Sequence, residues 1–271
     1  MKQRVHENFA AALGLLERDW RTFISYRIRP ITMLLSAFFS LTLFYYISRL
    51  VKVSSIGSAD DYYAFVVVGL IILQVLTSTL YTPPVNLQQE LFAGTFERLV
   101  TSPFGPVASV CAMLLFPFVQ ALVTAVVMLA AASALFGLPV EWSTAALALP
   151  VAVLGALAFS CFGLALAGVA LLVKQAAAGS TWIVAGITLI SGFYFPVALL
   201  PGWIEWASAV QPFTPTVDLL RHVLVGTPMN GEAWLKVLKV VAFAVVLLPV
   251  SLAILSACTR GSRRRATILE Y

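Results

Sequence analysis

Long stretches without any charged side chain are the feature that most constrains how this chain can fold. No Asp, Glu, Lys or Arg occurs between Glu141 and Lys174, and none occurs again until Glu205. Of the 271 residues, 61% are hydrophobic and only 11% are charged, whereas ordinary soluble domains carry about 25% charged residues. Because so many apolar side chains are accommodated only in lipid, we predict an integral membrane protein.

Apolar runs long enough to cross a bilayer recur along the chain and predict an all-α polytopic membrane protein with six transmembrane helices. Each such helix needs roughly 20 mostly apolar residues. A lysine at the bilayer centre costs about 3 kcal/mol, so Lys174 is expected in a surface loop between the fourth and fifth spans. The predicted spans are residues 30–50, 62–84, 107–136, 145–173, 176–195 and 234–257.

The fourth predicted span carries small residues at a spacing of four positions, which places them on one side of a helix. Small side chains allow two helix backbones to approach closely. We therefore expect tight helix packing along this span. The residues are Ala152, Ala156 and Ser160, followed by Gly163 and Ala167.

Residues 1–29, which precede the first span, are predicted to form a cytoplasmic N-terminus with an amphipathic helix. Its apolar residues recur at spacings of four and three, and therefore share one helical stripe. Such a helix lies in the membrane interface with its apolar side down. The alternative is an ordinary amphipathic helix packed on a partner. The stripe consists of Phe9, Leu13, Leu16, Trp20 and Phe23.

Residues 86–103 form the longest polar segment between two apolar runs and carry Glu90, Glu97 and Arg98. The segment is too short to fold alone. We interpret it as a short amphipathic helix at the membrane surface that is offered to another protein. A solvated loop helix with incidental charges is the alternative.

Prolines interrupt the chain after the fifth predicted span. Pro196, Pro201, Pro212 and Pro215 exclude one continuous helix, because proline lacks a backbone N–H and its ring clashes with the preceding turn. We predict that residues 196–226 form broken helices that dip into the outer leaflet. Such backbone is tolerated only where protein or a wet cavity covers it.

The distribution of basic residues predicts the orientation. With both termini in the cytoplasm, twelve Lys and Arg lie inside and five outside, as the positive-inside rule requires. This orientation places residues 86–103 and the basic tail, 258–271, in the cytoplasm of a bacterial-type inner membrane, and residues 196–226 outside. Most of the net charge of +5 sits at the two chain ends, which suits anionic lipid and not nucleic acid.

Several function classes lack their residues in this sequence. There is no GxxxxGK[ST] loop for ATP phosphates and no HExxH or GxSxG motif. His6 and His222, the two histidines, fall on opposite sides of the membrane, which disfavours an intramembrane hydrolase. A secondary transporter is also disfavoured, because the mid-span positions hold no ionisable residue: Gln74 and Gln120 are the most polar residues there, and neither titrates. These exclusions favour a membrane component driven by a separate motor.

Two sequence motifs resemble signatures of ABC exporter permeases of the type-2 class. QELFAGTFERLVTSP contains every fixed position of E-x-x-x-G-T-x-E-x-L-x-x-S-P, from Glu90 to Pro103. SGFYFPVALLPGW, followed by QPFTPTVDLLR, resembles the second signature, from Ser191 to Arg221. The order of parts also matches, so the resemblance covers essentially the whole chain.

The resemblance implies a fold, partners and roles. Two permease copies pair, as a homodimer, above two copies of a nucleotide-binding ATPase that binds ATP and Mg, while the permease itself has no catalytic, metal or cofactor site. Residues 86–103 correspond to the coupling helix that contacts the ATPase, residues 1–29 contain the connecting helix, and residues 196–226 resemble re-entrant helices that cap the exit. The coupling positions are Glu90, Gly94, Thr95, Glu97 and Arg98, and the connecting-helix positions are Leu16, Trp20 and Phe23.

Two further groups of residues are candidates for the transport path. Asp218, Arg221 and His222 are spaced i, i+3, i+4 and are predicted to form one cluster near the exit; a routine helical ion pair is the alternative. Together with Pro196, Pro201 and Trp203, they are the predicted residues of an outer gate. The substrate path is predicted between the second and fifth spans of the two subunits. Its polar positions are Gln74, Thr77, Thr188, Ser191 and Tyr194, for which hydrogen bonding between helices is the alternative.

Members of this class move drugs, lipids and polysaccharides. In length and outer signature the chain is similar to daunorubicin-resistance permeases, so we expect a hydrophobic or amphiphilic substrate, drug-like or lipid-like. A polysaccharide or lipid-linked glycan is the alternative substrate, and a non-transporting membrane scaffold is a remote alternative function.

Overall fold

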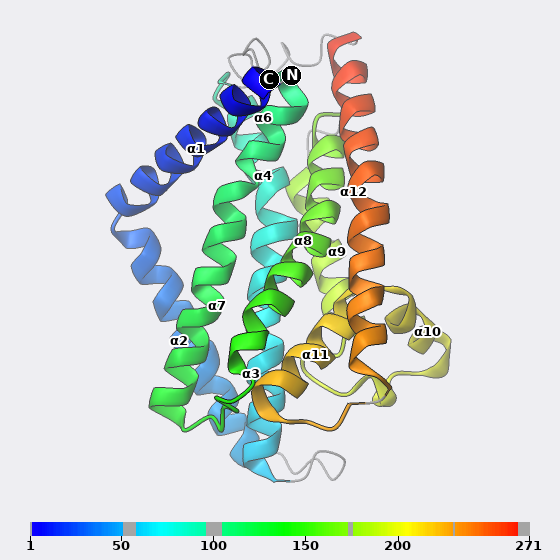
Figure 1. Cartoon of the computed structure of the whole chain (residues 1–271). Helices are drawn as coiled ribbons and strands as arrows, with labels where there is room; N and C mark the ends of the chain where they lie inside the picture. Colours follow the sequence, from blue (N-terminus) through cyan, green and yellow to red (C-terminus); the bar gives the residue numbers. More distant parts are fainter. Residues whose placement is uncertain (1, 51–57, 96–104, 173–175, 230, 265–271) are drawn as a thin grey trace.

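A computed structural model describes residues 2–50, 58–95, 105–172, 176–229 and 231–264. Within these ranges all regular secondary structure is helical (Figure 1). The elements are α1 (Lys2–Ser25), α2 (Ile28–Leu50), α3 (Ala59–Leu76), the π-helix η1 (Thr77–Tyr81), α4 (Thr82–Phe92), α6 (Gly105–Met113), α7 (Leu115–Phe136), α8 (Ala145–Ala170), α9 (Ala176–Ile190), the 3₁₀-helix η2 (Val197–Leu199), α10 (Gly202–Val210), α11 (Phe213–Val225) and α12 (Ala233–Arg264).

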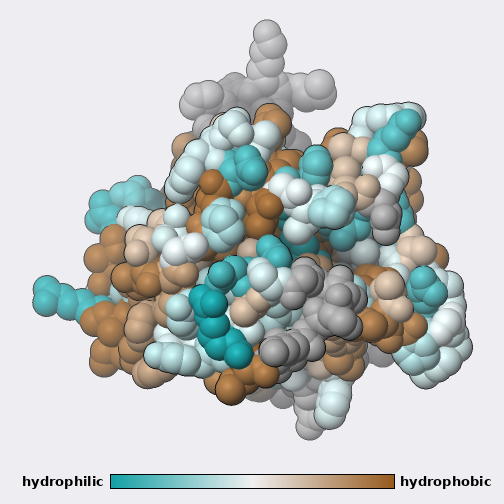
Figure 2. All heavy atoms as spheres, turned by 90° about the horizontal axis from the view of Figure 1, so that it is seen from below, coloured by the Kyte–Doolittle hydropathy of each residue, from teal (hydrophilic) through white to brown (hydrophobic). Residues whose placement is uncertain are grey.

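The long helices stand side by side in a bundle, and the start of α1 and the end of α12 lie at the same end of it (Figure 1). We call this the terminal end. Helix α1 leans across it, and α4 and α12 finish there. The short helices α10 and α11 lie at the opposite end, together with the start of α3 and the turn between α7 and α8. Seen from that opposite end, hydrophilic residues occupy much of the face and hydrophobic residues lie along its edges (Figure 2).

Five helices among the described residues are long and apolar enough to cross a membrane. Helix α9 has 15 residues, and at about 1.5 Å per residue it is roughly 22 Å long, less than a hydrocarbon core of about 30 Å. The chain therefore has at least five candidate spans, and the predicted sixth, at residues 176–195, stays a prediction. The five are Ile28–Leu50, Ala59–Phe92, Gly105–Phe136, Ala145–Ala170 and Ala233–Ser262.

The helix of the second predicted span does not end at Pro84 but continues as one helical rod to Phe92. The two prolines at positions 83 and 84 lack the N–H groups that an α-helix would use there. The chain widens into the π turn η1 immediately before them, and the N–H of Thr82 bonds to the carbonyl of Thr77. The prolines then occupy the first turn of α4, where missing donors are tolerated.

Helix α8 is packed against its neighbours through glycines. A Cβ built on Gly163 would lie 2.2 Å from the carbonyl oxygen of Thr79 in η1, and one on Gly155 would lie 2.4 Å from the methyl group of Thr216 in α11. Among the small residues that the sequence singled out, Ala156 and Ala167 are fully buried. The expectation of close packing along this span is confirmed.

Candidate functional site

The turn at the end of α4 terminates the helix. Gly94 has φ +68°, a left-handed conformation that residues with a side chain adopt only with strain. The N–H groups of Ala93, Gly94 and Thr95 bond back to the carbonyls of Gln89, Leu91 and Glu90, at 2.9, 3.1 and 3.1 Å. The rod therefore ends in a compact turn whose outer residues Phe92, Ala93 and Gly94 are exposed.

Three of the predicted coupling residues meet in this turn. The hydroxyl of Thr95 donates to the Glu90 carboxylate and lies 3.2 Å from the Glu90 backbone carbonyl. The Glu90 side chain is thereby held against Thr95. The other two predicted coupling residues, Glu97 and Arg98, lie outside the described residues.

The same carboxylate connects α4 to α1. Arg18 Nη2 lies 3.5 Å from Glu90 Oε1 and 2.8 Å from Asp19 Oδ1. The Glu90 side chain is about one-fifth exposed, while that of Arg18 is about half exposed. An ion pair of this kind contributes about 0–1 kcal/mol, so it orients the two helices more than it stabilises them.

Aromatic rings hold α1 more firmly. The rings of Trp20 and Phe23 lie 6.4 and 5.7 Å from the ring of Phe116 in α7, measured between centroids. Leu16, the third predicted residue of this helix, is half buried. Pairs of aromatic rings at such distances contribute about 0.5–1.5 kcal/mol beyond their buried area. The apolar stripe read from the sequence thus packs, at least in part, on the bundle itself.

An open groove of about 870 Å³ lies between α1 and the end of α4. It is bounded by the Arg18–Glu90 pair, and both charged and uncharged polar side chains line it. We call the turn Glu90–Thr95, Arg18 and this groove the coupling corner. The groove is lined by Arg18, Asp19, Thr22, Tyr26, Arg29, Asn86, Gln89, Glu90, Ala93, Thr95, Met113 and Phe116.

Most hydrogen-bond donors of the predicted path residues already have acceptors within the bundle. The hydroxyls of Thr77, Thr188 and Ser191 donate to Leu73, Val184 and Ile187 carbonyls of their own helices, at 2.8, 2.7 and 2.6 Å. Gln74 Nε2 lies 3.5 Å from Ser78 Oγ. The Tyr194 ring stacks on Phe44 with centroids 5.5 Å apart. These positions therefore present little unsatisfied polarity, and their role in transport stays a prediction.

The three predicted exit residues on α11 do not form one cluster. Asp218 pairs with Lys236 of α12 at 2.5 Å, and His222 Nδ1 lies 3.0 Å from the carbonyl oxygen of Thr227. Arg221 is buried and donates to the carbonyls of Phe65, Gly192 and Phe193, at 3.1, 2.9 and 3.0 Å. Each side chain thus has its own partner, because the helix turns them toward different neighbours.

The prolines of the predicted outer gate stand directly before short helices. Pro196 precedes η2 and Pro201 precedes α10, on which Trp203 and Trp206 are exposed. The gate role of these residues stays a prediction. Sequence reasoning missed Lys236 as the partner of Asp218 and the carbonyl anchoring of Arg221. The closing Leu-Arg of the second motif is the one sequence signal that pointed to Arg221.

The described residues hold no group of three or more His, Cys, Asp or Glu that could bind a metal ion.

The chain is similar to known membrane transport proteins. A family model described as "ABC-2 type transporter" matches residues 12–225, which is most of the chain.

Two curated relatives match over a shorter stretch. Nodulation protein J of Rhizobium meliloti (strain 1021) is 28% identical over 89 residues, which is 33% of this chain and 34% of that protein. Nodulation protein J of Rhizobium leguminosarum bv. trifolii is 30% identical over a stretch of the same length, again 33% and 34% of the two chains. The chain thus spans about a third of the length of the curated relatives it matches.

Proposed function

Because the chain belongs to the ABC-2 type transporter family, we propose that it is the permease subunit of an ATP-driven exporter. The family supplies the membrane component of transport and not a catalytic one. In our proposal two copies of the permease pair, and two copies of a separate ABC ATPase bind ATP and Mg below them. ATP is hydrolysed in that partner.

The coupling corner is the observation that carries this proposal. Helices α3 and α4, joined by η1, form one continuous rod from Ala59 to Phe92. A displacement of the turn Glu90–Thr95 would therefore move a membrane-spanning helix directly. Helix α1 lies against both the rod and α7, because Arg18 contacts Glu90 and Trp20 packs beside Phe116 of α7.

The ATPase is proposed to dock on the exposed turn after Phe92 and in the groove beside α1. Glu90 would then exchange its distant contact with Arg18 for a charge-assisted hydrogen bond to a basic group of the partner. Glu97 and Arg98, as predicted from the motif, would extend the same contact. Gly94 allows the partner's backbone to come close, because it has no side chain and nothing lies within 4 Å of its missing Cβ.

The orientation follows from this docking. The terminal end of the bundle would face the cytoplasm of a bacterial inner membrane, and α10 and α11 would face outward. Helix α9 would complete the sixth crossing, since α8 runs toward the terminal end and α10 lies at the opposite one (Figure 1). The count of twelve basic residues inside and five outside supports this arrangement.

We propose that the exported molecule is amphiphilic, with a drug-like or lipid-like apolar part. The hydroxyls of Thr77, Thr188 and Ser191 are already bonded to their own helices, so this surface makes few demands for hydrogen bonds. Neither relative is named for drug resistance, and a polysaccharide or lipid-linked glycan is therefore tested beside drugs and lipids.

The test is ATP hydrolysis by the reconstituted complex. The chain and its ATPase are placed together in lipid nanodiscs, and hydrolysis is measured with lipids, drugs and glycolipids added in turn. Glu90→Arg should reduce permease-stimulated hydrolysis and export at least tenfold. Glu205→Arg makes the same charge change on exposed α10 at the opposite end and should leave the stimulation within twofold of wild type.

Two results would contradict the proposal. One is normal export by Glu90→Arg. The other is an ATPase whose rate is the same with and without this chain for every substrate class, which would favour the non-transporting scaffold.

A further inference from the structure

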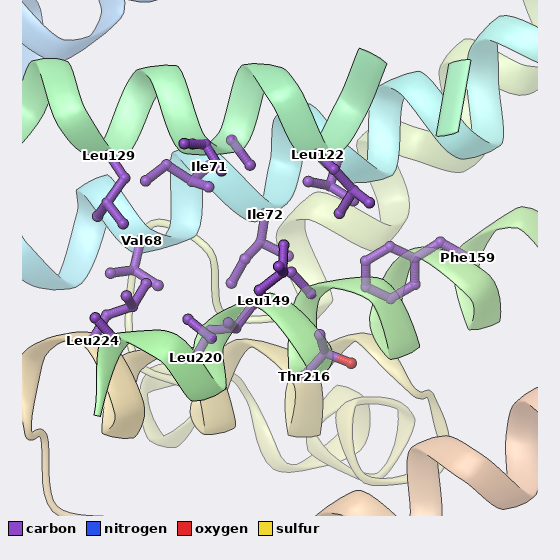
Figure 3. Close-up of a pocket in the computed structure, with 16 residues that line it drawn as sticks. Val68, Ile71, Ile72, Leu122, Leu129, Leu149, Phe159, Thr216, Leu220 and Leu224 are labelled. Carbon is purple, nitrogen blue, oxygen red and sulfur yellow. The ribbon is translucent and has the colours of Figure 1, made fainter. Parts of the chain in front are cut away.

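An apolar cavity of about 110 Å³ lies inside the bundle, between α3, α7, α8 and α11. Figure 3 shows its walls converging from the four helices, with Phe159 at one end and Val68, Leu129 and Leu224 at the other. It lies apart from the coupling corner and includes none of the predicted path or gate residues. The lining consists of Val68, Ile71, Ile72, Val75, Leu122, Ala125, Val126, Leu129, Ala145, Ala148, Leu149, Ala152, Phe159, Thr216, Leu220 and Leu224.

The cavity offers water almost nothing to bond to. Thr216 is its one polar lining residue, and the Thr216 hydroxyl donates to the Pro212 carbonyl at 2.9 Å. The Thr216 methyl group is pressed against Gly155. A buried water typically makes about three hydrogen bonds, and cavities lined by aliphatic and aromatic groups stay dry or bind apolar molecules. The lining therefore selects a purely hydrocarbon ligand.

The cavity has a side opening between α7 and α8. Val126 and Leu149 line it and are 56% and 55% exposed, whereas Val68 and Ile72 on its inner wall are 0% and 1% exposed. Both flanking helices are candidate membrane spans. Leu149 lies four residues into α8, or about 6 Å along its axis, and the exposed Trp142, a residue type typical of the membrane interface, precedes that helix. In a bilayer, the opening would face lipid tails.

We propose that this cavity binds the end of a single hydrocarbon chain, inserted sideways between α7 and α8. Its volume is somewhat less than the roughly 150 Å³ of a dry engineered cavity that binds benzene, so it admits a segment of one chain and no headgroup. The occupant would touch Ile72 and Val75, one turn before η1, and Leu220 of α11. It would thus fill the space between the coupling rod and an outer helix. This site is independent of the exported substrate.

The experiment uses the full chain in nanodiscs with photoactivatable lipids. One arm carries a phospholipid with a diazirine near the end of an acyl chain, and the other a diazirine-labelled free fatty acid. After irradiation, mass spectrometry locates the adducts. We expect labelling of Val68 and Ile72, which lipid on the outer surface cannot reach. Labelling by the phospholipid identifies bilayer lipid as the source, and labelling by the fatty acid alone identifies a free amphiphile.

A variant that fills the cavity provides the second readout. Ala152→Leu adds three carbons to its wall and should reduce labelling of Ile72 at least fivefold. Ala146→Leu, on an exposed face of the same helix, should leave that labelling unchanged. Added benzene should raise the unfolding temperature of the wild type and of Ala146→Leu, because a ligand of the folded state stabilises it, but not that of Ala152→Leu.

Two outcomes would overturn the inference. The first is wild-type adducts confined to exposed residues such as Val126 and Leu149 in both arms, a result that requires no variant to fold. The second is equal labelling of Ile72 in the wild type and in folded Ala152→Leu.

Discussion

Replacing Gly163 by alanine tests how closely α8 and the π turn must approach. The added Cβ would meet the carbonyl oxygen of Thr79 at 2.2 Å and the Cα of Leu80 at 3.1 Å. Both are backbone atoms of a buried segment, so no side chain can swing away. A carbon–oxygen contact ordinarily measures about 3.3 Å, and the two helices must therefore separate by roughly 1 Å.

The magnitude follows from two opposing effects. Alanine in place of glycine stabilises a helix by about 0.4–1 kcal/mol through the unfolded chain. Overpacking of a filled interior costs about 1–3 kcal/mol. The net expectation for Gly163→Ala is a loss of about 1–2 kcal/mol. For a chain of this size that lowers the unfolding temperature by roughly 2–8 °C.

The assay is thermal unfolding of the detergent-purified chain, followed by loss of the monodisperse peak at one fixed heating rate. Gly186→Ala on α9 is the control, because nothing lies within 4 Å of its missing Cβ, and it should leave the temperature unchanged or slightly raised. If Gly163→Ala is as stable as Gly186→Ala, the close packing of α8 on η1 is refuted.

Three further predictions concern the contacts that position the two ends of the bundle. Arg221→Met should abolish most of the folded yield, measured as the monodisperse fraction after purification. The carbonyls of Phe65, Gly192 and Phe193 would lose their donor, and the two buried ones, of Gly192 and Phe193, cost about 1–3 kcal/mol each. A yield like that of the wild type would contradict this. Asp218→Asn removes the charge that pairs with Lys236 and should lower stability by less than about 1 kcal/mol, since the carboxylate is partly exposed, so an unfolding temperature as low as that of Arg221→Met counts against it. A double-mutant cycle of Trp20→Ala and Phe116→Ala should give a coupling energy of about 0.5–1.5 kcal/mol, and strict additivity would show that the rings do not anchor α1.

Much of the fold could be predicted because each part has a local cause. Charge-free runs mark the spans, and the proline spacing after residue 195 marks the short helices η2, α10 and α11. In the E-x-x-x-G-T pattern, Glu90, Gly94 and Thr95 all fall within one turn of the end of a helix. Their proximity therefore follows from their spacing in the sequence alone. Gly163 and its neighbours were found because helix periodicity puts small residues on one side.

The remaining features depend on contacts between distant segments. The π turn lets the helix pass through Pro83 and Pro84, and a local rule that ends helices before proline misses it. The spacing on α11 predicts that Asp218, Arg221 and His222 meet. An ion pair at i, i+3 stabilises a helix only slightly, and contacts with backbone carbonyls or with a lysine on another helix outweigh it. Arg221 therefore turns inward to Phe65 and Phe193, and Asp218 turns to Lys236. No pattern in the sequence records which helix lies opposite.

The proposed coupling requires the turn after α4 to lie in the cytoplasm, in contact with an ATPase below the permease. The direct measurement is labelling of Ala93→Cys, an exposed position in that turn, with a membrane-impermeant maleimide. We predict labelling in inverted membrane vesicles, none in intact cells, and protection of the vesicle signal when the ATPase is added. Labelling of this cysteine from outside intact cells would contradict a cytoplasmic coupling turn.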